Sequence, residues 1–401
     1  NLFENLSHYL VRTRYCCLFN GTLTAKHFLQ AFIIGNKMDD VKLDFRQLVM
    51  KYGFKYEEHI IKTEDGYILT LFRIPSKGPA VFLMHGFLGS SDDFIVAGEG
   101  SALGYLLARS GYDVWFGNAR GNKYSRRHYT IETNDSSFWD FSWHEIGIYD
   151  LPSMITYVLN VTNQTKIKYV GYSQGCTTLF VMLSEKPEFN KKISIVIALS
   201  PVALMTNVKS PILKLLSPIA LKLPTLARNL GVHEFLPNNE LIELLKRAIC
   251  TIIDVICSNP LFLVFGLNYS QLNATNLPVI FGHLPAGASV KQFAHYCQGL
   301  VSGDFKFFDY GTNENMEKYA SLTPPIYKLQ NVLVPVSMFF SDSDWFADPR
   351  DVAFLSYRLK NVVDIYKVPY KGFSHLDFII AKDVVKLVYA RILKLLMSFQ
   401  S

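Results

Sequence analysis

The chain has 401 residues, of which 49% are hydrophobic and 18% are charged, and its formal net charge is +6. This length and apolar content are enough for a sizeable buried core. The basic residues are spread along the chain, which does not indicate nucleic-acid binding, and no run of 18 apolar residues is present to span a membrane.

Residues 1–38 form an N-terminal segment that no pattern assigns. Residues 55–61 and 67–74 lie on either side of Glu64-Asp65-Gly66 and predict a β-hairpin. From there to Ser200, strand patterns alternate with helical ones, which is typical of a mostly parallel sheet. We therefore expect residues 39–203 to form the first part of an α/β core.

An apolar strand is predicted over residues 80–84, and it ends in His85-Gly86. An HG motif at the end of an early central strand lets backbone N–H groups face a nucleophile and stabilise an oxyanion. The expected donors are the amides of Phe87 and of Gln174, the residue after the candidate nucleophile. His85 precedes the candidate nucleophile, Ser173, in the chain. The histidine base of an α/β-hydrolase follows its serine, so we expect His85 to be structural.

Residues 171–175 read Gly-Tyr-Ser-Gln-Gly, which fits the G-x-S-x-G nucleophile elbow. Residues 166–170 alternate like a strand entering a sheet, and residues 176–183 are apolar enough for a buried helix. The turn between such elements is sharp, and glycines are needed because bulk on either side would clash with the strand and helix. This strand–turn–helix context makes Ser173 the candidate nucleophile.

The pattern changes over residues 204–328, where strand-like alternation stops and apolar helical stretches dominate, at residues 211–223, 239–256 and 290–301. This change predicts a helical cap inserted between strands of the sheet. Residues 210–224 are rich in Leu and Ile and carry only lysines as charges. They fit a helix that faces the core and, equally well, a lid that covers the active site and docks on lipid.

Residues 329–401 are expected to complete the core. Residues 332–340 predict a buried strand. Three aspartates follow it, namely Asp342, Asp344 and Asp348. An acid just past the C-terminal end of a strand can orient a catalytic histidine. Asp348 precedes a proline and is expected to cap a helix instead.

A further strand is predicted over residues 362–369, and the loop after it carries His375. The order of Ser173, an acid and then His375 is that of the α/β-hydrolases. The sequence therefore predicts an α/β-hydrolase fold, with a mostly parallel central sheet flanked by helices and an inserted helical cap or lid.

Seven stretches carry a more specific resemblance. They are residues 63–69, 85–91, 111–122, 138–145, 149–152, 347–352 and 375–378. Together they resemble the acid lipase family that includes gastric lipase and lysosomal acid lipase, and most of all its insect members. The resemblance selects Asp344 as the catalytic acid. The chain departs from the family pattern at Tyr172, where close relatives often carry histidine.

The resemblance also implies a disulfide bond in the cap, for which Cys250 and Cys257 are the candidates. Seven residues of continuous helix would hold their Cα atoms about 10 Å apart, beyond the reach of a disulfide bond. The helix must therefore break between the two cysteines if the bond forms. The alternative is a pair of free buried thiols.

Acceptor sequences for N-glycosylation are more frequent than chance predicts for this length. The seven candidates are Asn5, Asn20, Asn134, Asn160, Asn163, Asn268 and Asn273. This excess predicts passage through the secretory pathway, with the lysosome or the extracellular space as the destination.

These features together predict a lipase that hydrolyses carboxylic esters of neutral lipids through Ser173, His375 and Asp344 and an acyl-serine intermediate. Triacylglycerol is the substrate that the resemblance implies first, and sterol esters come second. The expected partner is a lipid ester at a lipid–water interface, and no cofactor or metal is expected. Two alternatives stay open: an esterase of the same fold for small soluble esters, and a non-catalytic lipid-binding protein on a hydrolase scaffold.

Overall fold

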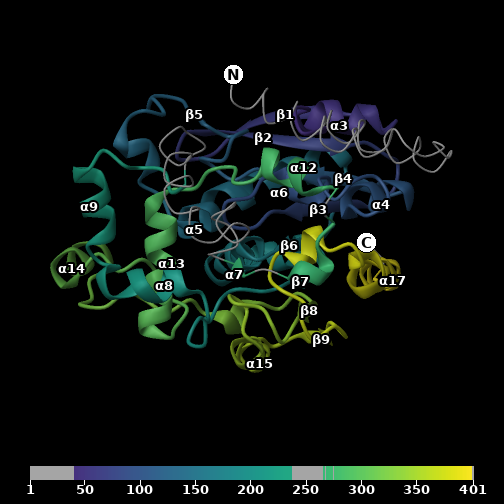
Figure 1. The fold of residues 1–401 in the computed structure, drawn as a ribbon. Coiled ribbons are helices and arrows are strands. Elements are labelled where there is room, and N and C mark those ends of the chain that lie inside the picture. The colour runs from purple at the N-terminus through teal and green to yellow at the C-terminus, as the bar shows by residue number, and fades with distance from the viewer. Residues whose placement is uncertain (1–39, 237–264, 267, 274, 400–401) are drawn as a thin grey trace, which may run out of the picture.

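The computed structural model describes residues 40–236, 265–266, 268–273 and 275–399. Within these residues, nine strands form one sheet in the order β1-β2-β4-β3-β6-β7-β8-β9, and β5 pairs with β2 (Figure 1). The strands are β1 Glu57–Lys62, β2 Tyr67–Ile74, β3 Ala80–Met84, β4 Asp113–Phe116, β5 Arg127–His128, β6 Ile167–Tyr172, β7 Ile193–Leu199, β8 Val336–Phe340 and β9 Val362–Lys367. The pairs made by β2 are antiparallel, and the pairs from β4 through β9 are parallel.

Helices and short 3₁₀ or π turns connect the strands. The α-helices are α3 Phe45–Lys51, α4 Leu103–Arg109, α5 Trp143–Glu145, α6 Leu151–Thr162, α7 Gln174–Glu185, α8 Pro211–Leu216, α9 Leu223–Asn229, α12 Leu277–His283, α13 Val290–Ser302, α14 Thr312–Tyr319, α15 Pro349–Arg358, α16 Asp377–Ile380 and α17 Ala390–Ser398. The 3₁₀ and π turns are η1 Ser91–Phe94, η2 Ser136–Trp139, η3 Ile146–Asp150, η4 Pro187–Lys192, η5 Ser217–Ile219, η7 Tyr269–Gln271, η8 Leu329–Asn331 and η9 Val385–Tyr389.

The core of the fold follows the predicted pattern. The hairpin is present, since β1 and β2 pair antiparallel from Glu57 opposite Arg73 to Lys62 opposite Ile68. Every residue of β3, β4, β6 and β7 is buried, as expected of strands that are covered on both faces. Helices α4, α6 and α7 pack against β4, β3 and β6, respectively. The mostly parallel sheet flanked by helices is therefore as predicted.

The long connection between β7 and β8 is the inserted segment. Its described residues form helices, turns and isolated bridges, and none of the named strands lies there. Helices α8 and α9 both pack against α13, beside the sheet (Figure 1). The predicted boundaries at residues 203/204 and 328/329 fall inside this connection, and the division into core and cap stays a prediction.

The predicted helical stretch at residues 211–223 is not one helix. Helix α8 ends at Leu216, the 3₁₀ turn η5 contains Pro218, and α9 starts only at Leu223. Proline has no backbone N–H and its ring clashes with the preceding turn, so it interrupts a helix at this point. The other described helical stretch matches its prediction closely, since α13 covers Val290–Ser302.

Several predictions lie outside the described residues. These are the N-terminal segment at residues 1–38, the helical stretch at residues 239–256, the candidate disulfide of Cys250 and Cys257, and the candidate glycosylation sites Asn5 and Asn20. Within the described part of the chain, no helix is both long enough and apolar enough to cross a bilayer.

Candidate active site

Ser173 is the single residue between β6 and α7. Its backbone has φ 52° and ψ −111°, a combination that residues other than glycine rarely adopt. The neighbouring glycines permit this turn. A Cβ on Gly175 would lie 2.3 Å from the carbonyl oxygen of Met84, and a Cβ on Gly171 would lie 2.9 Å from the carbonyl carbon of Gly175. The sequence therefore places Ser173 in the strained elbow that G-x-S-x-G predicts.

Three predicted residues form a continuous hydrogen-bonded chain. His375 Nε2 lies 2.8 Å from Ser173 Oγ, and His375 Nδ1 lies 2.8 and 3.0 Å from the two carboxylate oxygens of Asp344. The strands that precede these residues, β6, β8 and β9, are parallel to one another and to β7, which lies between β6 and β8. The segments after them therefore meet at one edge of the sheet. All three side chains are buried. This is the geometry in which histidine can take a proton from serine.

Asp344 is held as a carboxylate. Burial acts to raise its pKa, but the charge of His375 and several hydrogen bonds lower the pKa below the usual value. Two of these hydrogen bonds come from the backbone N–H groups of Phe346 and Ala347, at 2.8 and 2.9 Å. An ionised Asp344 favours the imidazole tautomer with hydrogen on Nδ1, which leaves Nε2 free to accept the serine proton.

The other two aspartates after β8 have different surroundings. Asp342 has a side chain that is 43% exposed, and it pairs with Lys367 at 2.8 Å. Asp348 is the N-cap of α15, since its carboxylate accepts the N–H of Arg350 and Pro349 follows in the first turn. The structure thus brings only Asp344 of the three to His375, and the expectation that Asp348 caps a helix is confirmed.

Ser200 is a residue of this site that the sequence analysis missed. It directly follows β7, its Oγ lies 2.5 Å from Asp344 Oδ2 and 2.7 Å from His375 Nδ1, and its φ is 49°. The hydroxyl can donate to the carboxylate and so hold it in place. A serine after a strand has no motif of its own. The feature that could have indicated Ser200 is its position directly after β7, the neighbour of the strand that leads to Ser173.

Three aromatic rings, those of Phe265, Phe346 and Tyr172, lie 5.1 to 5.4 Å from the His375 ring. The Phe265 ring stacks on the His375 ring at 5.1 Å with an interplanar angle of 7°. The Tyr172 hydroxyl donates to the backbone carbonyl of His375 at 3.0 Å, so the residue that departs from the family pattern holds the histidine loop. A cavity of only about 10 Å³ remains beside Ser173, and its lining includes Phe87 and Phe265.

The predicted oxyanion residues flank the nucleophile. The HG loop approaches Ser173 so closely that a Cβ on Gly86 would lie 3.3 Å from the Ser173 Cβ and 2.8 Å from the Tyr172 ring. Phe87 follows in that loop. Gln174 is the first residue of α7, where backbone N–H groups have no partner within the helix. The backbone segments that carry both predicted donors therefore lie at the nucleophile.

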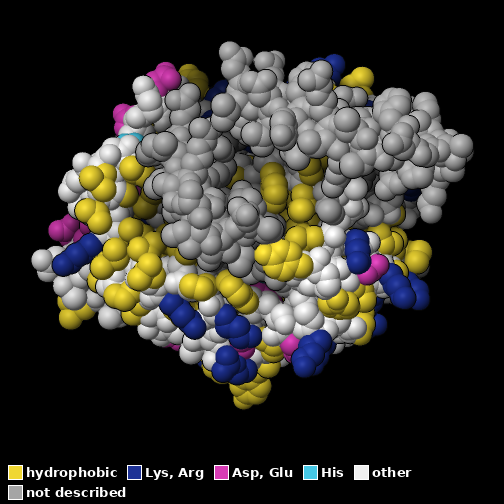
Figure 2. All heavy atoms as spheres, viewed as in Figure 1, with side chains coloured by type: hydrophobic (Ala, Val, Ile, Leu, Met, Phe, Trp, Pro, Cys, Tyr) yellow, Lys and Arg dark blue, Asp and Glu magenta, His cyan; other side chains and the backbone are white. Residues whose placement is uncertain are grey.

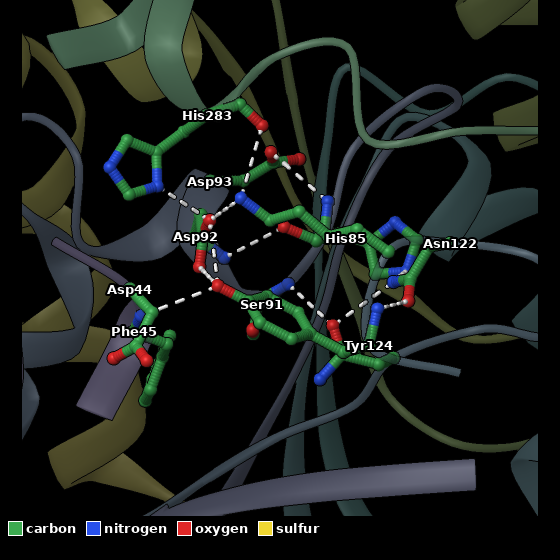
Figure 3. Close-up of polar contacts among 12 residues, drawn as sticks. Asp44, Phe45, His85, Ser91, Asp92, Asp93, Asn122, Tyr124 and His283 are labelled. Carbon is green, nitrogen blue, oxygen red and sulfur yellow. Dashed lines mark hydrogen bonds and ion pairs between the residues drawn. The ribbon is translucent and has the colours of Figure 1, made fainter. Parts of the chain in front are cut away.

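His85 connects the backbone of its own loop to that of the loop after β4, and Figure 3 shows it beside Asn122. Its Nδ1 donates to the Gly86 carbonyl at 2.8 Å, and its Nε2 accepts the N–H of Ala119 at 3.1 Å. Burial lowers the pKa of His85 to about 4, so the ring is neutral above that pH. These contacts support the structural role that the chain order predicts.

A second buried cluster connects the inserted segment to the HG loop (Figure 3). Asp92 is fully buried and accepts hydrogen bonds from the Tyr124 hydroxyl at 3.0 Å and from His283 Nδ1 at 2.6 Å, and it pairs with Lys123. Burial acts to raise the pKa of Asp92, but the bond from His283 and the charge of Lys123 lower it. Since His283 is the last residue of α12, this cluster fixes α12 against the loop that carries Phe87.

Asp93 is the next residue, and its pKa is raised whereas that of Asp92 is lowered. Its carboxyl accepts the N–H groups of Gly86 and Ser90 at 3.3 and 3.4 Å, and burial raises its pKa to about 7 from an ordinary 3.8. At a pH between these two pKa values, Asp93 holds a proton in the folded protein and has released it in the unfolded chain. The free energy of unfolding therefore falls as the pH rises from about 4 to about 7.

We expect Asp93 alone to lower the free energy of unfolding by roughly 4 kcal/mol over that range, at about 1.4 kcal/mol per pH unit. Denaturant unfolding at pH 4.5 and pH 7.5 measures the loss. Asp93→Asn should reduce this loss by the share of Asp93 because the amide does not titrate, whereas Asp304→Asn, at a side chain 37% exposed, should leave the loss unchanged. An equal loss in the wild type and in Asp93→Asn would contradict the assignment.

The segment predicted as a core helix or a lid has two different sides. Leu213 and Ala220 are buried, and α8 and η5 pack against α13. The other side exposes a set of large apolar residues that continues into α9, here named the exposed apolar face: Leu215, Ile219, Leu221, Leu226 and Leu230. Figure 2 shows hydrophobic side chains gathered over α8 and α9, with basic side chains nearby. The described residues that line the cavity at Ser173 do not include this segment, and Phe265 covers His375 instead.

Comparison with known proteins shows which family the chain resembles. A family model described as alpha/beta hydrolase fold matches residues 79–379, and one described as a partial alpha/beta-hydrolase lipase region matches residues 45–98. Lipase 1 of Drosophila melanogaster is 42% identical over 90% of this chain and 81% of its own length. Lysosomal acid lipase/cholesteryl ester hydrolase of Homo sapiens and gastric triacylglycerol lipase of Bos taurus are each 38% identical, over 90% of this chain and 92% of theirs.

The chain belongs to the acid lipase family of the α/β-hydrolases. The resemblance found in the sequence and the predicted fold class are both confirmed. Among solved structures, an esterase from Pyrococcus furiosus has the same fold as this acid lipase, with a TM-score of 0.50 at 15% identity over 90% of this chain and 97% of that one. As a member of this family, the protein is a carboxylic ester hydrolase.

Proposed function

We propose that this acid lipase hydrolyses the ester bonds of neutral lipids, with triacylglycerols as its first substrate class and sterol esters as the second. The observation that carries the proposal is the hydrogen-bonded chain from Ser173 Oγ through His375 to Asp344. The names of the bovine and human relatives, a triacylglycerol lipase and a cholesteryl ester hydrolase, support these two substrate classes.

We infer a role for each group from these contacts. His375 Nε2 takes the proton of Ser173 as its oxygen attacks the ester carbonyl, and Asp344 stabilises the resulting imidazolium. The backbone amides of Phe87 and Gln174 donate to the oxyanion of the tetrahedral intermediate. His375 then gives its proton to the departing alcohol and activates a water that hydrolyses the acyl-serine. No step in this scheme needs a cofactor or metal.

The exposed apolar face supports action at a lipid surface. The side chains of Leu215 and Leu221 are 76% and 54% exposed. The lysines at positions 214 and 222 are also exposed, which suits an interface with negative charge. Burying such leucines in lipid is favourable by about 1.5–3 kcal/mol for each fully buried side chain. This face therefore favours binding to an emulsion over remaining in water.

We expect the rate on a long-chain triacylglycerol to rise sharply once the substrate exceeds its solubility and forms an emulsion. Leu215→Ser combined with Leu221→Ser should lower the emulsion rate by at least about 10-fold, because two apolar side chains no longer anchor the enzyme. Turnover of p-nitrophenyl butyrate, which is soluble, should stay within about twofold of the wild type. Paired assays on the two substrates measure both effects.

Leu333→Ser is the matched control, since Leu333 is 52% exposed and lies before β8, at the opposite end of the strand from Asp344. It should change neither rate. A hyperbolic rate that passes smoothly through the solubility limit, and is the same in the double variant, would favour the alternative of an esterase for small soluble esters.

We also propose that the protein enters the secretory pathway and acts in the lysosome or outside the cell. The human relative is named a lysosomal acid lipase. Of the candidate glycosylation sites, Asn134, Asn160 and Asn163 have exposed side chains. Asn268 and Asn273 are half-buried, and Asn268 donates to Asp377 at 2.8 Å, so it is less suited to carry a glycan. A gel shift of the secreted protein after N-glycan removal tests the proposal, and an unchanged mobility would count against it.

A further inference from the structure

Helix α13 contacts both residues whose backbone amides are proposed to bind the oxyanion. The ring of Phe87 lies 5.4 Å from the ring of Tyr296 and 6.4 Å from that of Phe293. On the other side, the Gln174 side-chain oxygen accepts from Gln292 Nε2 and from the Tyr296 hydroxyl, each at 3.2 Å. A helix of the insertion thus touches both walls of the proposed oxyanion hole.

The bonds to Gln174 are buried. Gln174, Gln292 and Tyr296 are each only 2% exposed, so the amide oxygen of Gln174 depends on protein donors rather than on water. The two donors lie four positions apart and therefore share one face of α13. Because Gln174 is the first residue of α7, anchoring its side chain restrains the turn that also carries its backbone N–H.

The capping of α13 determines which atom of Gln292 faces Gln174. Gln292 Oε1 accepts the backbone N–H of Ser289 at 2.8 Å, and Ser289 Oγ accepts the backbone N–H of Gln292 at 3.0 Å. This capping box uses the amide oxygen of Gln292, and its Nε2 is directed to Gln174. A single side chain therefore both begins the helix and connects it to the residue after the nucleophile.

We propose that Gln292 and Tyr296 are positioning residues for the oxyanion hole. They hold Gln174 by hydrogen bonds, and Tyr296 together with Phe293 packs on Phe87, so that both backbone amides keep the spacing the transition state needs. The inference rests on the proposed ester hydrolysis through Ser173. It gives Gln292 and Tyr296 an indirect role in catalysis, because a small displacement of these two side chains would weaken transition-state stabilisation without removing any triad residue.

Gln292→Glu tests the connection with little loss of capping. Glutamate is favoured at this position of a capping box and can still accept from Ser289. When ionised, however, it turns an acceptor toward the Gln174 oxygen. We expect kcat on p-nitrophenyl butyrate at pH 8 to fall by about 10- to 100-fold with KM unchanged. The deficit should shrink as the pH falls, because the protonated carboxyl can donate again.

A double-mutant cycle separates this action from general packing. Gln174→Met keeps the backbone amide and removes the side-chain acceptor, and Gln292→Met removes the donor. Each should lower kcat, and the double variant should be no slower than the slower single variant, because both remove one interaction. Tyr296→Phe should lower kcat by a smaller factor, since one donor remains. Fully multiplicative losses would overturn the proposed coupling.

Gln298→Glu is the matched control on the same helix. Its side chain bonds to the backbone N–H and carbonyl of Asp309, both at 2.8 Å, and so stabilises the insertion away from Gln174. It should lower Tm but not kcat. If Gln292→Glu also lowers only Tm while Ser173→Ala is inactive, the positioning role fails and the proposed function stands. If Ser173→Ala stays active, the proposed function fails as well.

Discussion

Ser173→Ala is expected to abolish ester hydrolysis, with a loss of roughly 10⁶-fold in kcat. Alanine removes the oxygen that lies 2.8 Å from His375 Nε2 and leaves the hydrogen bond between His375 and Asp344 in place. The side chain that is lost is small, so the fold should be retained. Initial rates on p-nitrophenyl butyrate, together with the Tm of each protein, measure the two effects.

A fluorophosphonate probe gives the same prediction a direct chemical readout. It should label Ser173 and no other serine in the wild type, and it should label nothing in Ser173→Ala. Ser184→Ala is the matched control. It removes a buried hydroxyl from the far end of α7 that has no hydrogen-bond partner among the described residues, so labelling should persist. Labelling at a different serine would overturn the nucleophile assignment.

Asp344→Asn is expected to lower kcat by about 10⁴-fold. The asparagine amide keeps the size of the side chain, but its NH₂ group favours the wrong imidazole tautomer on His375 and cannot stabilise the imidazolium. The Ser200 hydroxyl, now 2.5 Å from a carboxylate oxygen, would also lose its charged acceptor. Rates on a soluble ester and phosphonate labelling both report the change.

Asp342→Asn is the control for this substitution. Asp342 follows the same strand, but its exposed side chain pairs with Lys367 and lies outside the hydrogen-bonded chain. Its loss should change kcat by less than about twofold, as expected for an exposed ion pair. If Asp342→Asn is the damaging variant and Asp344→Asn is mild, the catalytic acid has been assigned to the wrong residue.

Much of the site could be predicted from the sequence because its parts are local. The elbow at Ser173 needs glycines next to the serine, and the N-cap at Asp348 is followed by a proline that suits the first turn of α15. Such requirements act between neighbours in the chain, so a short segment is enough to reveal them. The choice of Asp344 over Asp342 was not local, since both follow β8, and it came from the resemblance to the acid lipases.

The sequence by itself determined the strands that lead to the HG motif, the serine, the acid and the histidine, together with the elbow and the order of the three catalytic residues. Only the tertiary structure decided what surrounds them. Ser200 reaches Asp344 across 144 positions of the chain, and the Tyr172 hydroxyl reaches the backbone of His375 across 203. Gln292 reaches Gln174 across 118 positions. These contacts leave no local pattern, because they exist only once the parallel strands bring their C-terminal ends together and the inserted helices pack on that edge.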